Sequence, residues 1–595
     1  MALQDALGGK DISVLQTSGS QISGSLTDAP VSKEISSQKT NAPVTKAASG
    51  SQTNAPATKD TSGQQTNPPQ TPAPLTFVFS KKSIDARHGK VKLVMRYDVY
   101  IGEKAPSAED LLPQWKSVKG KDCKTVLVVG SGPAGLFGAL KLLEGGVKPI
   151  IIERGSDTKS RKVDIAKIST KGLLDSDSNY CFGEGGAGTF SDGKLFTRSN
   201  KRGNVGQVLR IFNHFGADPS ILTDAHPHIG TDKLPYIINA MRAKIIELGG
   251  EFHFNTRCTG FITNGKNSVD GIKTLNTKSG EEKDFLADSV LLATGHSAGD
   301  IYELLAKTAP QSLEAKTFAA GVRIEHKRQT IDSIQFHGRK MPNAAEYSLT
   351  SQQTDGSKPY SKEDERGVYT FCMCPGGFVV PSATESGTIV VNGMSAAKRN
   401  SQWSNSAVVV ETRPEDIPEK FKEMAKKNGC PALAGLYFRS SIEREAFLQA
   451  NTSGKENPST NEESMAGQKA PAQLLTDFLS HKKSPQEKLP KTSYFPGITS
   501  SRLDQWLPDQ IARRMEKAFK EFNKKMKGFI CDEALLIAPE TRTSTPVRIL
   551  RDRESYECCA LKKLYPAGEG SGYSGGIVSS AMDGINACKK ILERL

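Results

Sequence analysis

Apolar and polar residues along 124–153 follow the pattern of a strand, a helix and a second strand. The run Val-Leu-Val-Val at 126–129 is typical of a strand that is buried on both faces of a parallel sheet. The chain then turns into a helix that carries Leu136, Leu140 and Leu143 at helical spacing. A second apolar run at 149–152 predicts a neighbouring parallel strand. The pattern therefore predicts a β-α-β unit at the centre of an α/β domain.

The turn inside this unit reads GSGPAG at 130–135, and glycine serves a different purpose at each of its three positions. Gly130 permits the tight turn, Gly132 lets the backbone approach a pyrophosphate, and Gly135 lets the helix pack against the strand. The start of the helix offers free N–H groups to the same anion. Glu153 ends the second strand, about where a ribose-binding carboxylate belongs. We interpret the unit as a dinucleotide-binding site, with a glycine turn used only for packing as the alternative.

The remaining pattern predicts an interrupted dinucleotide-binding domain. A helix at 232–250 and a β-meander at 251–290 lead to the strand 289–293, which is followed by Thr294 and Gly295. Strand-like runs dominate 317–500, which we expect to form an inserted, mostly-β substrate domain. Its polar segment 451–470 is expected to be an exposed loop. The dinucleotide-binding domain is therefore expected to consist of two segments, 119–316 and 501–595, on either side of the insertion at 317–500.

Two further glycine-rich stretches carry candidate chemistry. The loop GEGGAGTFSDGKL at 183–195 could lie along a flat cofactor ring, with Thr189, Ser191 and Lys194 as polar contacts. An ordinary surface loop is the alternative. Near the end of the chain, Gly568 and Glu569 precede a helix whose start offers another set of N–H groups to an anion or carbonyl.

The amino-terminal 118 residues differ in composition from the rest. Residues 1–75 contain neither aromatic residues nor arginine and repeat a Thr-Asn-Ala/Pro-Pro unit every 13 residues, so we expect a disordered tail. Alternating runs within 76–118 predict strands of a small α+β module. The tail lacks the apolar core of a secretory signal and the arginines of a typical transit peptide. We expect a cytoplasmic protein, and import into a plastid or mitochondrion stays open.

Charge and cysteine content narrow the classes of function. The 10 cysteines in 595 residues are too few for a disulfide scaffold, and no run of about 18 apolar residues predicts a membrane span. The net charge of +14 is compatible with nucleic acid or with an anionic small molecule. Its densest basic stretch, 512–529, has Met515, Phe519 and Phe522 on one side. We interpret that stretch as a solvated helix face rather than a nucleic-acid surface.

Taken together, these motifs resemble the FAD-dependent oxidoreductases with a glutathione-reductase-like FAD fold. The chain is more closely similar to the FAD-dependent dehydrogenase, or NAD(P)/FAD-dependent oxidoreductase, family of bacteria and plastid-bearing eukaryotes. The resemblance rests on SIDARHGKVK (83–92), FGEGGAGTFSDGKL (182–195), PHIGTD (227–232), GVRIEH (321–326), VYTFCMCPGGFVV (368–380), VNGMS (391–395), ETRTSTPVRI (540–549) and YPAGEGSGYSGGIVSSAMDGI (565–585).

This resemblance implies an α/β fold with a Rossmann-like FAD-binding domain in three layers (β/β/α). It implies FAD as cofactor, with Glu153 at the adenosine ribose, Glu569 near the flavin-side phosphate or ribityl chain, and the helix start near the flavin. No second G-x-G-x-x-G unit is found, so NAD(P)H would bind only transiently as an electron donor. The implied cofactor-binding residues are Gly130, Gly132, Pro133, Ala134, Gly135, Glu153, Arg154, Gly185, Gly186, Thr189, Ala293, Gly295, Gly568, Glu569, Gly575, Gly576 and Ile577.

Catalytic residues are less clearly marked than cofactor-binding ones. Lys194 could stabilise reduced flavin or bind an acidic substrate, and Cys372 and Cys374 could exchange electrons with flavin. Alternate residues of a strand share a face, but a disulfide between them would close a strained ring, so pocket or structural thiols are favoured. We interpret His296 as a loop or capping residue. Further pocket candidates, each equally suited to a structural ion pair, are Arg323, Glu325, His326, Arg542 and Arg548.

We expect a flavoenzyme that transfers hydride or electrons between FAD and a small substrate that the sequence does not identify. Two other classes stay open at this point: a flavoprotein that binds or modifies RNA, and a non-catalytic FAD-binding scaffold. The basic charge is the only feature that favours RNA, and salt-sensitive RNA binding would be its signature.

Overall fold

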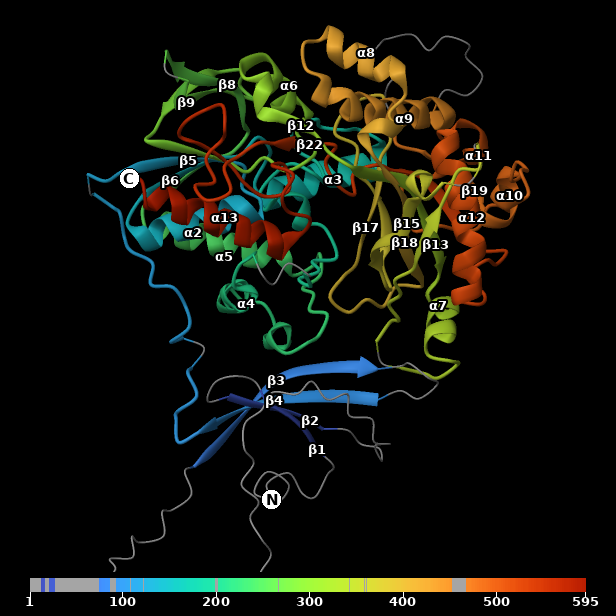
Figure 1. The fold of residues 1–595 in the computed structure, drawn as a ribbon, viewed down its shortest axis with the longest axis horizontal. Helices are drawn as coiled ribbons and strands as arrows, with labels where there is room; N and C mark the ends of the chain where they lie inside the picture. The colour runs from blue at the N-terminus through green and yellow to red at the C-terminus, as the bar shows by residue number, and fades with distance from the viewer. Residues whose placement is uncertain are drawn as a thin grey trace, which may run out of the picture. The chain divides into compact units, whose positions relative to one another are not determined.

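The computed structural model describes most of the chain (Figure 1). The described residues are 12–16, 21–26, 74–85, 92–107, 109–120, 122–197, 202–265, 267–341, 343–357, 359, 361–451 and 467–595. They divide into two units, Met1–Ser107 and Ala108–Leu595. The predicted repeat region and most of the polar segment 451–470 lie outside the described residues.

The first unit contains a four-stranded antiparallel sheet in the order β1-β2-β4-β3. Its strands are β1 (Ile12–Gln16), β2 (Gln21–Leu26), β3 (Leu75–Asp85) and β4 (Lys92–Ile101). The alternating runs that predicted strands after residue 75 form β3 and β4. Strands β1 and β2 fall within 1–75, and the composition of this range does not predict them. Residues 1–11, 17–20 and 27–73 lie outside the described residues.

A five-stranded parallel sheet forms the centre of the second unit, in the order β23-β11-β5-β6-β7. Its strands are β5 (Thr125–Val129), β6 (Lys148–Ile152), β7 (Glu251–His253), β11 (Ser289–Leu292) and β23 (Leu564–Pro566). This arrangement confirms the predicted β-α-β unit and its Rossmann-like domain. The order also brings β23, from the end of the chain, next to β11.

Both faces of this sheet are buried, as the apolar run of β5 predicts. Val126 and Val128 pack into one core with helices α2 (Pro133–Gly145), α5 (Leu234–Glu247) and α13 (Ile577–Leu592). Leu127 and Val129 belong to the core on the other face. Figure 1 shows the three helices along one side of β5 and β6, and β8 and β9 along the other. The three-layer architecture is therefore present.

The predicted meander forms a separate antiparallel sheet in the order β10-β9-β8. Its strands are β8 (Thr256–Asn264), β9 (Ser268–Asn276) and β10 (Glu282–Leu286). The flanking strands β7 and β11 belong to the parallel sheet instead. The meander thus covers the face of the parallel sheet opposite α2.

A seven-stranded, mostly antiparallel sheet forms the second large element of this unit. Its order is β14 (Thr350–Gln353), β15 (Arg366–Cys374), β18 (Trp403–Thr412), β13 (Phe318–Lys327), β21 (Leu535–Glu540), β19 (Ala470–Leu474) and β20 (Ile498–Ser500). The mostly-β domain is therefore present. Its strand β21, which pairs with β13 and β19, comes from beyond residue 500, so the sheet extends past the boundary predicted there.

Helix α12 (Asp509–Lys525) packs on this sheet through the apolar stripe that the sequence predicts. Met515, Phe519 and Phe522 are fully buried, whereas the basic side chains Arg513, Lys520 and Lys524 belong to the polar side of the helix. The stripe explains the pattern at 512–529 by packing alone. Among the described residues, no helix has the length and apolar composition needed to cross a bilayer.

The remaining elements connect or cover these sheets. Two short two-stranded sheets pair β12 (Leu313–Ala315) with β22 (Val547–Ile549) and β16 (Phe378–Pro381) with β17 (Val391–Met394). The other α-helices are α3 (Thr158–Lys171), α4 (Val205–His214), α6 (Gly299–Thr308), α7 (Arg328–Gln335), α8 (Glu419–Lys427), α9 (Ala434–Asn451), α10 (Leu475–Leu479) and α11 (Leu503–Trp506).

Candidate functional site

One cavity of about 410 Å³ lies where the parallel sheet meets the mostly-β domain. Its wall includes the ends of β5, β6 and β11 and the turn after β23, which are the carboxyl ends of parallel strands. Open α/β sheets bind ligands outside this edge. The same wall includes residues of β15, β17 and β21. The cavity is therefore built jointly by the dinucleotide fold and the mostly-β domain.

Most of the residues implied for cofactor binding lie in this wall. They are Gly130, Gly132, Pro133, Ala134, Glu153, Arg154, Gly186, Ala293, Gly295, Gly568, Glu569, Gly575, Gly576 and Ile577. The catalytic candidates Lys194, Cys372 and Cys374 also line it. Gly135, Gly185 and Thr189 lie outside the wall, where they pack or hydrogen-bond against neighbouring backbone.

Gly135 is a packing position, because a Cβ there would lie 1.9 Å from the carbonyl oxygen of Gly130. Gly185 donates its N–H to the carbonyl of Ser131 and has a positive φ of 78°. Thr189 is buried and donates from its hydroxyl to the carbonyl of Glu184. The contacts of Gly185 and Thr189 hold the loop 183–195 in place. Direct contact of Gly185 and Thr189 with the cofactor, which the resemblance implies, therefore stays a prediction.

The start of α2 offers unoccupied backbone donors to the cavity. Its N-cap is Gly132, at φ −71°, and no side chain caps the helix. A Cβ on Gly132 would meet only the Cα of Gly186, at 3.8 Å. Neither protein packing nor backbone conformation therefore requires glycine here. The bare backbone at this position leaves room for close approach of a ligand.

The Glu153 carboxylate is a buried acceptor at the end of β6. Its Oε2 accepts from the N–H and hydroxyl of Ser131, at 2.9 and 2.7 Å, and its Oε1 accepts from the N–H of Gly155 and Gly183, both at 3.0 Å. The carboxylate thus joins the turn after β5 to the loop 183–195. A ribose hydroxyl would share or replace these contacts, since a carboxylate has about four acceptor positions.

Arg154 follows Glu153 and is held by two carboxylates and a ring. It pairs with Asp177 at 2.8 Å and with Asp300 at 3.0 Å. Its guanidinium carbon lies 4.1 Å from the centroid of Phe182. These contacts fix a cationic plane in the wall near the Glu153 end of the cavity.

At the other end of the dinucleotide fold, α13 presents its start to the cavity. Its N-cap is Gly576, and no side chain caps the helix. A Cβ on Gly575 or Gly576 would have nothing within 4 Å, so open space lies beside both. The N–H of Gly568 donates to Asp583, which fixes the preceding turn, and Glu569 pairs with His296 at 3.3 Å. His296 is therefore a partner of a wall carboxylate, in addition to its place in a loop.

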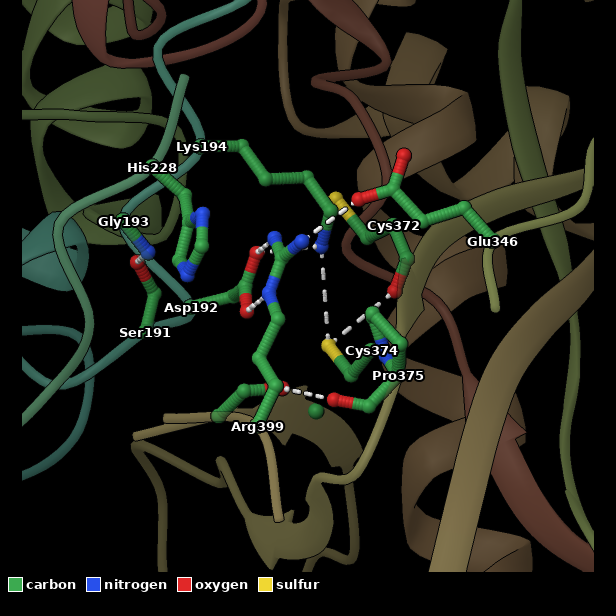
Figure 2. Close-up of polar contacts among 12 residues, drawn as sticks. Ser191, Asp192, Gly193, Lys194, His228, Glu346, Cys372, Cys374, Pro375 and Arg399 are labelled. Atoms are coloured by element: carbon green, nitrogen blue, oxygen red, sulfur yellow. Dashed lines mark hydrogen bonds and ion pairs between the residues drawn. The ribbon is translucent and has the colours of Figure 1, made fainter. Parts of the chain in front are cut away.

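Lys194 joins a polar cluster in the cavity wall, which Figure 2 shows. Its Nζ donates to Cys374 Sγ at 3.7 Å and pairs with Asp192 at 2.9 Å. Arg399 donates to both oxygens of Asp192, at 3.1 and 2.6 Å, and to Glu346 at 2.5 Å. The cluster links the loop 183–195 to Cys374 and Arg399 of the mostly-β domain, across separations of 180 and 207 residues in sequence.

The charges in this cluster stay ionised because they compensate one another. Burial would lower the pKa of Lys194, but Cys374 and Asp192 raise it above its ordinary value. Burial would raise the pKa of Asp192, but Lys194 and Arg399 hold it below its usual range. The hydrogen bond with His226 and the charge of Arg399 likewise overcome burial and lower the pKa of Glu346 to about 2. The wall near Lys194 is therefore charged at neutral pH.

We expected Cys372 and Cys374 to share a face as alternate residues of a regular strand, and this expectation is wrong because β15 is irregular there. The pairing of β15 with β18 shifts register between Phe371 and Cys374, and Cys372 has a positive φ of 44°. Cys372 is exposed and Cys374 is buried. The thiol of Cys374 donates to the carbonyl of Cys372 at 3.2 Å. The irregular backbone turns both residues toward the cavity wall.

Of the five other pocket candidates, only Arg542 lines the cavity. It is held by Glu443 and Thr384. Arg323 is buried behind the wall and pairs with Glu540 at 3.0 Å. The last three make contacts elsewhere: Glu325 with Ser493, His326 with the carbonyl of Phe529, and Arg548 with Glu314.

The residues predicted from the sequence do not include Asp192, Glu346, Arg399 or Glu540, which lie in or beside the cavity wall. Asp192 stands within the glycine-rich loop that was singled out, two residues before Lys194. Glu540 begins the string ETRTSTPVRI, which carried some of the resemblance. Glu346 and Arg399 have no signal in the sequence, because only the tertiary fold brings them to Lys194.

The donor set of the cavity fits FAD. Two helix starts without side-chain caps point their N–H groups at it, which suits a pyrophosphate and a carbonyl. Three glycines, at 295, 575 and 576, leave space in which a Cβ would meet no protein atom within 4 Å. A buried carboxylate stands at the end of the second strand. These features together define a dinucleotide-binding flavoprotein site.

Comparison with known proteins agrees with this class. The family described as "FAD binding domain" matches residues 123–175, and the family described as "FAD-dependent protein, C-terminal domain-like" matches residues 317–543. A protein of Clostridium beijerinckii, described only as uncharacterized, is 37% identical over 534 residues, which cover 86% of this chain and 92% of that protein. The chain belongs to this family of FAD-dependent proteins, and FAD is its cofactor.

Several solved flavoprotein structures are similar at low identity. The flavin-dependent brominase Bmp2 is 12% identical, with 79% of each chain covered and a TM-score of 0.33. The quinol fumarate reductase of E. coli is 10% identical, covering 79% of this chain and 70% of that chain, with a TM-score of 0.30. A geranylgeranyl bacteriochlorophyll reductase-like protein from Thermoplasma acidophilum is 12% identical, with 79% of each chain covered and a TM-score of 0.30.

Proposed function

We propose that this protein is an oxidoreductase that transfers hydride or electrons between FAD and a small substrate. The observation that carries the proposal is the shared cavity: the walls of one space contain both the dinucleotide motif and side chains of the mostly-β domain. A cofactor bound at the motif would extend toward those side chains. The substrate would then bind where Lys194, Phe196, Phe371 and Met373 line the wall.

Different residues would bind the pyrophosphate, the ribose and the flavin half of the cofactor. The start of α2 and the bare backbone at Gly132 suit the pyrophosphate, and Glu153 suits the ribose hydroxyls. Glu569 and the start of α13 suit the flavin half. When bound, flavin supplies the exchange of an electron pair with the substrate.

The substrate end of the cavity combines apolar and charged groups. Two aromatic rings and a methionine offer an apolar surface, and Lys194 offers a cation beside Cys374. This lining supports a small molecule with one anionic or strongly polar group, which Lys194 would orient. Lys194 would also stabilise negative charge that develops nearby during electron transfer.

A nicotinamide donor would bind only transiently at this same end. The described residues contain one five-stranded parallel sheet and no second sheet of that kind that could form a separate NAD(P)H domain. RNA has no comparable support, because the basic stretch at 512–529 is explained by the packing of α12.

Anaerobic titration of the purified holoprotein with NADH, NADPH and dithionite tests the proposal. We expect the flavin absorbance to bleach with dithionite and with at least one physiological type of donor. Lys194→Met should slow reduction by an anionic donor, and Lys244→Met, which removes a surface lysine paired with Glu247, should not. Flavin that remains oxidised with every donor, dithionite included, would contradict an oxidoreductase and favour a scaffold.

A further inference from the structure

Glu540 ends β21 in the cavity wall, with one carboxylate oxygen held and the other open. The side chain is buried, and its Oε2 accepts from Arg323 Nε at 3.0 Å. Among the described residues, no N–H or O–H donates to its Oε1. A carboxylate can accept about four hydrogen bonds, so most of its capacity is unused. A molecule in the cavity can therefore reach this oxygen.

The partner of Glu540 is fixed from several directions. Arg323 Nη1 donates to Asn405 at 2.7 Å and to the carbonyl of Cys372 at 3.3 Å, and Nη2 donates to Asn392 at 3.3 Å. A Cβ on Gly393 would lie 2.2 Å from Nη1, so glycine is required for the guanidinium to occupy this place. The rigid arginine orients the carboxylate before any ligand binds.

Four glutamates line the cavity, Glu153, Glu346, Glu540 and Glu569, and their surroundings differ. Both carboxylate oxygens of Glu153 already accept protein donors, and Glu569 pairs with His296. Glu346 has both Arg399 and His226 as partners, which keep its pKa at about 2 (Figure 2). The charged and titratable groups acting on Glu540 are Arg323, His296 and the thiol of Cys372. Burial raises the pKa of Glu540 above its ordinary value, although Arg323 and His296 act in the opposite sense. Glu540 thus combines a carboxylate oxygen that no described donor holds with burial that favours the protonated form, which suits proton exchange with a molecule in the cavity.

We propose that Glu540 is the catalytic acid–base residue of this cavity, and that the substrate carries an O–H or N–H next to the carbon that loses hydride. This class comprises alcohols and amines in the oxidising direction, and carbonyl compounds and imines in the reducing direction. The inference rests on the proposed oxidoreductase function and narrows its substrate.

The step balances with groups already assigned. In oxidation, the C–H bond would break, and its hydride, with the electron pair, would pass to FAD, the acceptor of the proposed function. The O–H or N–H bond also breaks, and its proton passes to Oε1 of Glu540. A C=O or C=N bond would form, and the two electrons that the substrate loses would be those accepted by FAD.

Infrared spectroscopy of the holoprotein tests the proton-carrying group without any substrate. We expect a protonated-carboxyl band that disappears as pH rises and shifts in D₂O. E540Q should lack this band, and E540D should move it. D416N should keep it, because Asp416 is likewise paired with a buried arginine, Arg366, but does not line the cavity. A wild-type titration retained in E540Q would overturn the proposal.

Anaerobic bleaching with 2-hydroxy acids, simple alcohols and primary amines tests the substrate class. We expect at least one of these donors to reduce the wild-type flavin, and E540Q to slow the reaction by about 100-fold or more and to remove its dependence on pH. If E540Q does not fold, E540D keeps the charge opposite Arg323 and should slow the reaction by about 10-fold or more.

The two proposals fail in different ways. Equal rates and equal pH profiles in wild type and E540Q would overturn the role of Glu540 and leave the oxidoreductase standing. One set of results would overturn the substrate class alone. NADH or NADPH would bleach the flavin, but none of the carbon donors would, and the matching carbonyl compounds or imines would not oxidise the reduced flavin. Flavin that dithionite cannot reduce would contradict the oxidoreductase itself.

Discussion

Replacement of Gly132 by alanine separates cofactor binding from folding. The residue has φ −71°, which alanine adopts readily, and a Cβ would contact only Gly186 Cα at 3.8 Å. Alanine is less favourable than glycine at an N-cap by less than about 1 kcal/mol. The apoprotein should therefore unfold at nearly the wild-type urea concentration.

The same methyl group should weaken FAD binding strongly. It would occupy the space beside the start of α2, where the backbone N–H groups would meet a pyrophosphate. A hydrogen bond to a charged group contributes about 1.5–3 kcal/mol, and losing one such bond corresponds to a roughly 10- to 140-fold rise in Kd. This estimate counts one lost contact and excludes any further displacement of the cofactor.

Calorimetric titration of apoprotein with FAD, together with urea unfolding, measures both quantities. Gly135→Ala is the matched control, because its Cβ would lie 1.9 Å from the carbonyl oxygen of Gly130 and outside the cavity. That variant should lose stability even without FAD, by about 1–3 kcal/mol or more. Wild-type FAD affinity in Gly132→Ala would refute the placement of the pyrophosphate.

Three further expectations follow from buried polar groups. Glu153→Gln should destabilise the apoprotein by about 1–3 kcal/mol in urea unfolding, because one side-chain oxygen no longer accepts from Ser131 or from the loop N–H groups; unchanged stability would contradict this. Because the folded protein holds the pKa of Asp192 below its usual range, its ion pairs stabilise the fold above about pH 4 and this contribution is lost as pH falls. Asp192→Asn should therefore lower the melting temperature at pH 7 and approach wild type in acid, and a pH-independent difference would count against it. Burial lowers the pKa of His326 to about 4, whereas the pKa in the unfolded chain is about 6.5. The unfolded state therefore takes up this proton first, and the free energy of unfolding falls by about 3 kcal/mol as pH falls between these values. His326→Asn should remove that acid-side loss in urea titrations, and an unchanged slope would refute it.

The cofactor end of the site was predictable because its signals are local. One segment of about 30 residues contains the strand, the glycine turn, the helix and the terminal Glu153, and each position has a separate steric or polar reason. Burial on both faces of β5 follows from its continuous apolar run. The resemblance added the order of the later segments, which local pattern alone does not determine.

The substrate end was less predictable because its contacts are distant in sequence. Arg323 meets Glu540 only because β13 and β21 are neighbours in the seven-stranded sheet. Arg399 and Asp192 belong to different segments of the sequence, the first in the mostly-β domain and the second in the loop 183–195, and only the tertiary fold brings them together. Alternation along a strand also failed at Cys372, where a register shift interrupts β15. Such irregularities depend on tertiary pairing, which no short window of sequence contains.

The most direct test of the account is the absorbance spectrum of the purified protein, with the released cofactor quantified after denaturation. The account predicts a flavin spectrum and on the order of one FAD per chain, either as purified or after incubation of the apoprotein with FAD. A colourless protein that does not take up FAD would contradict the central claim.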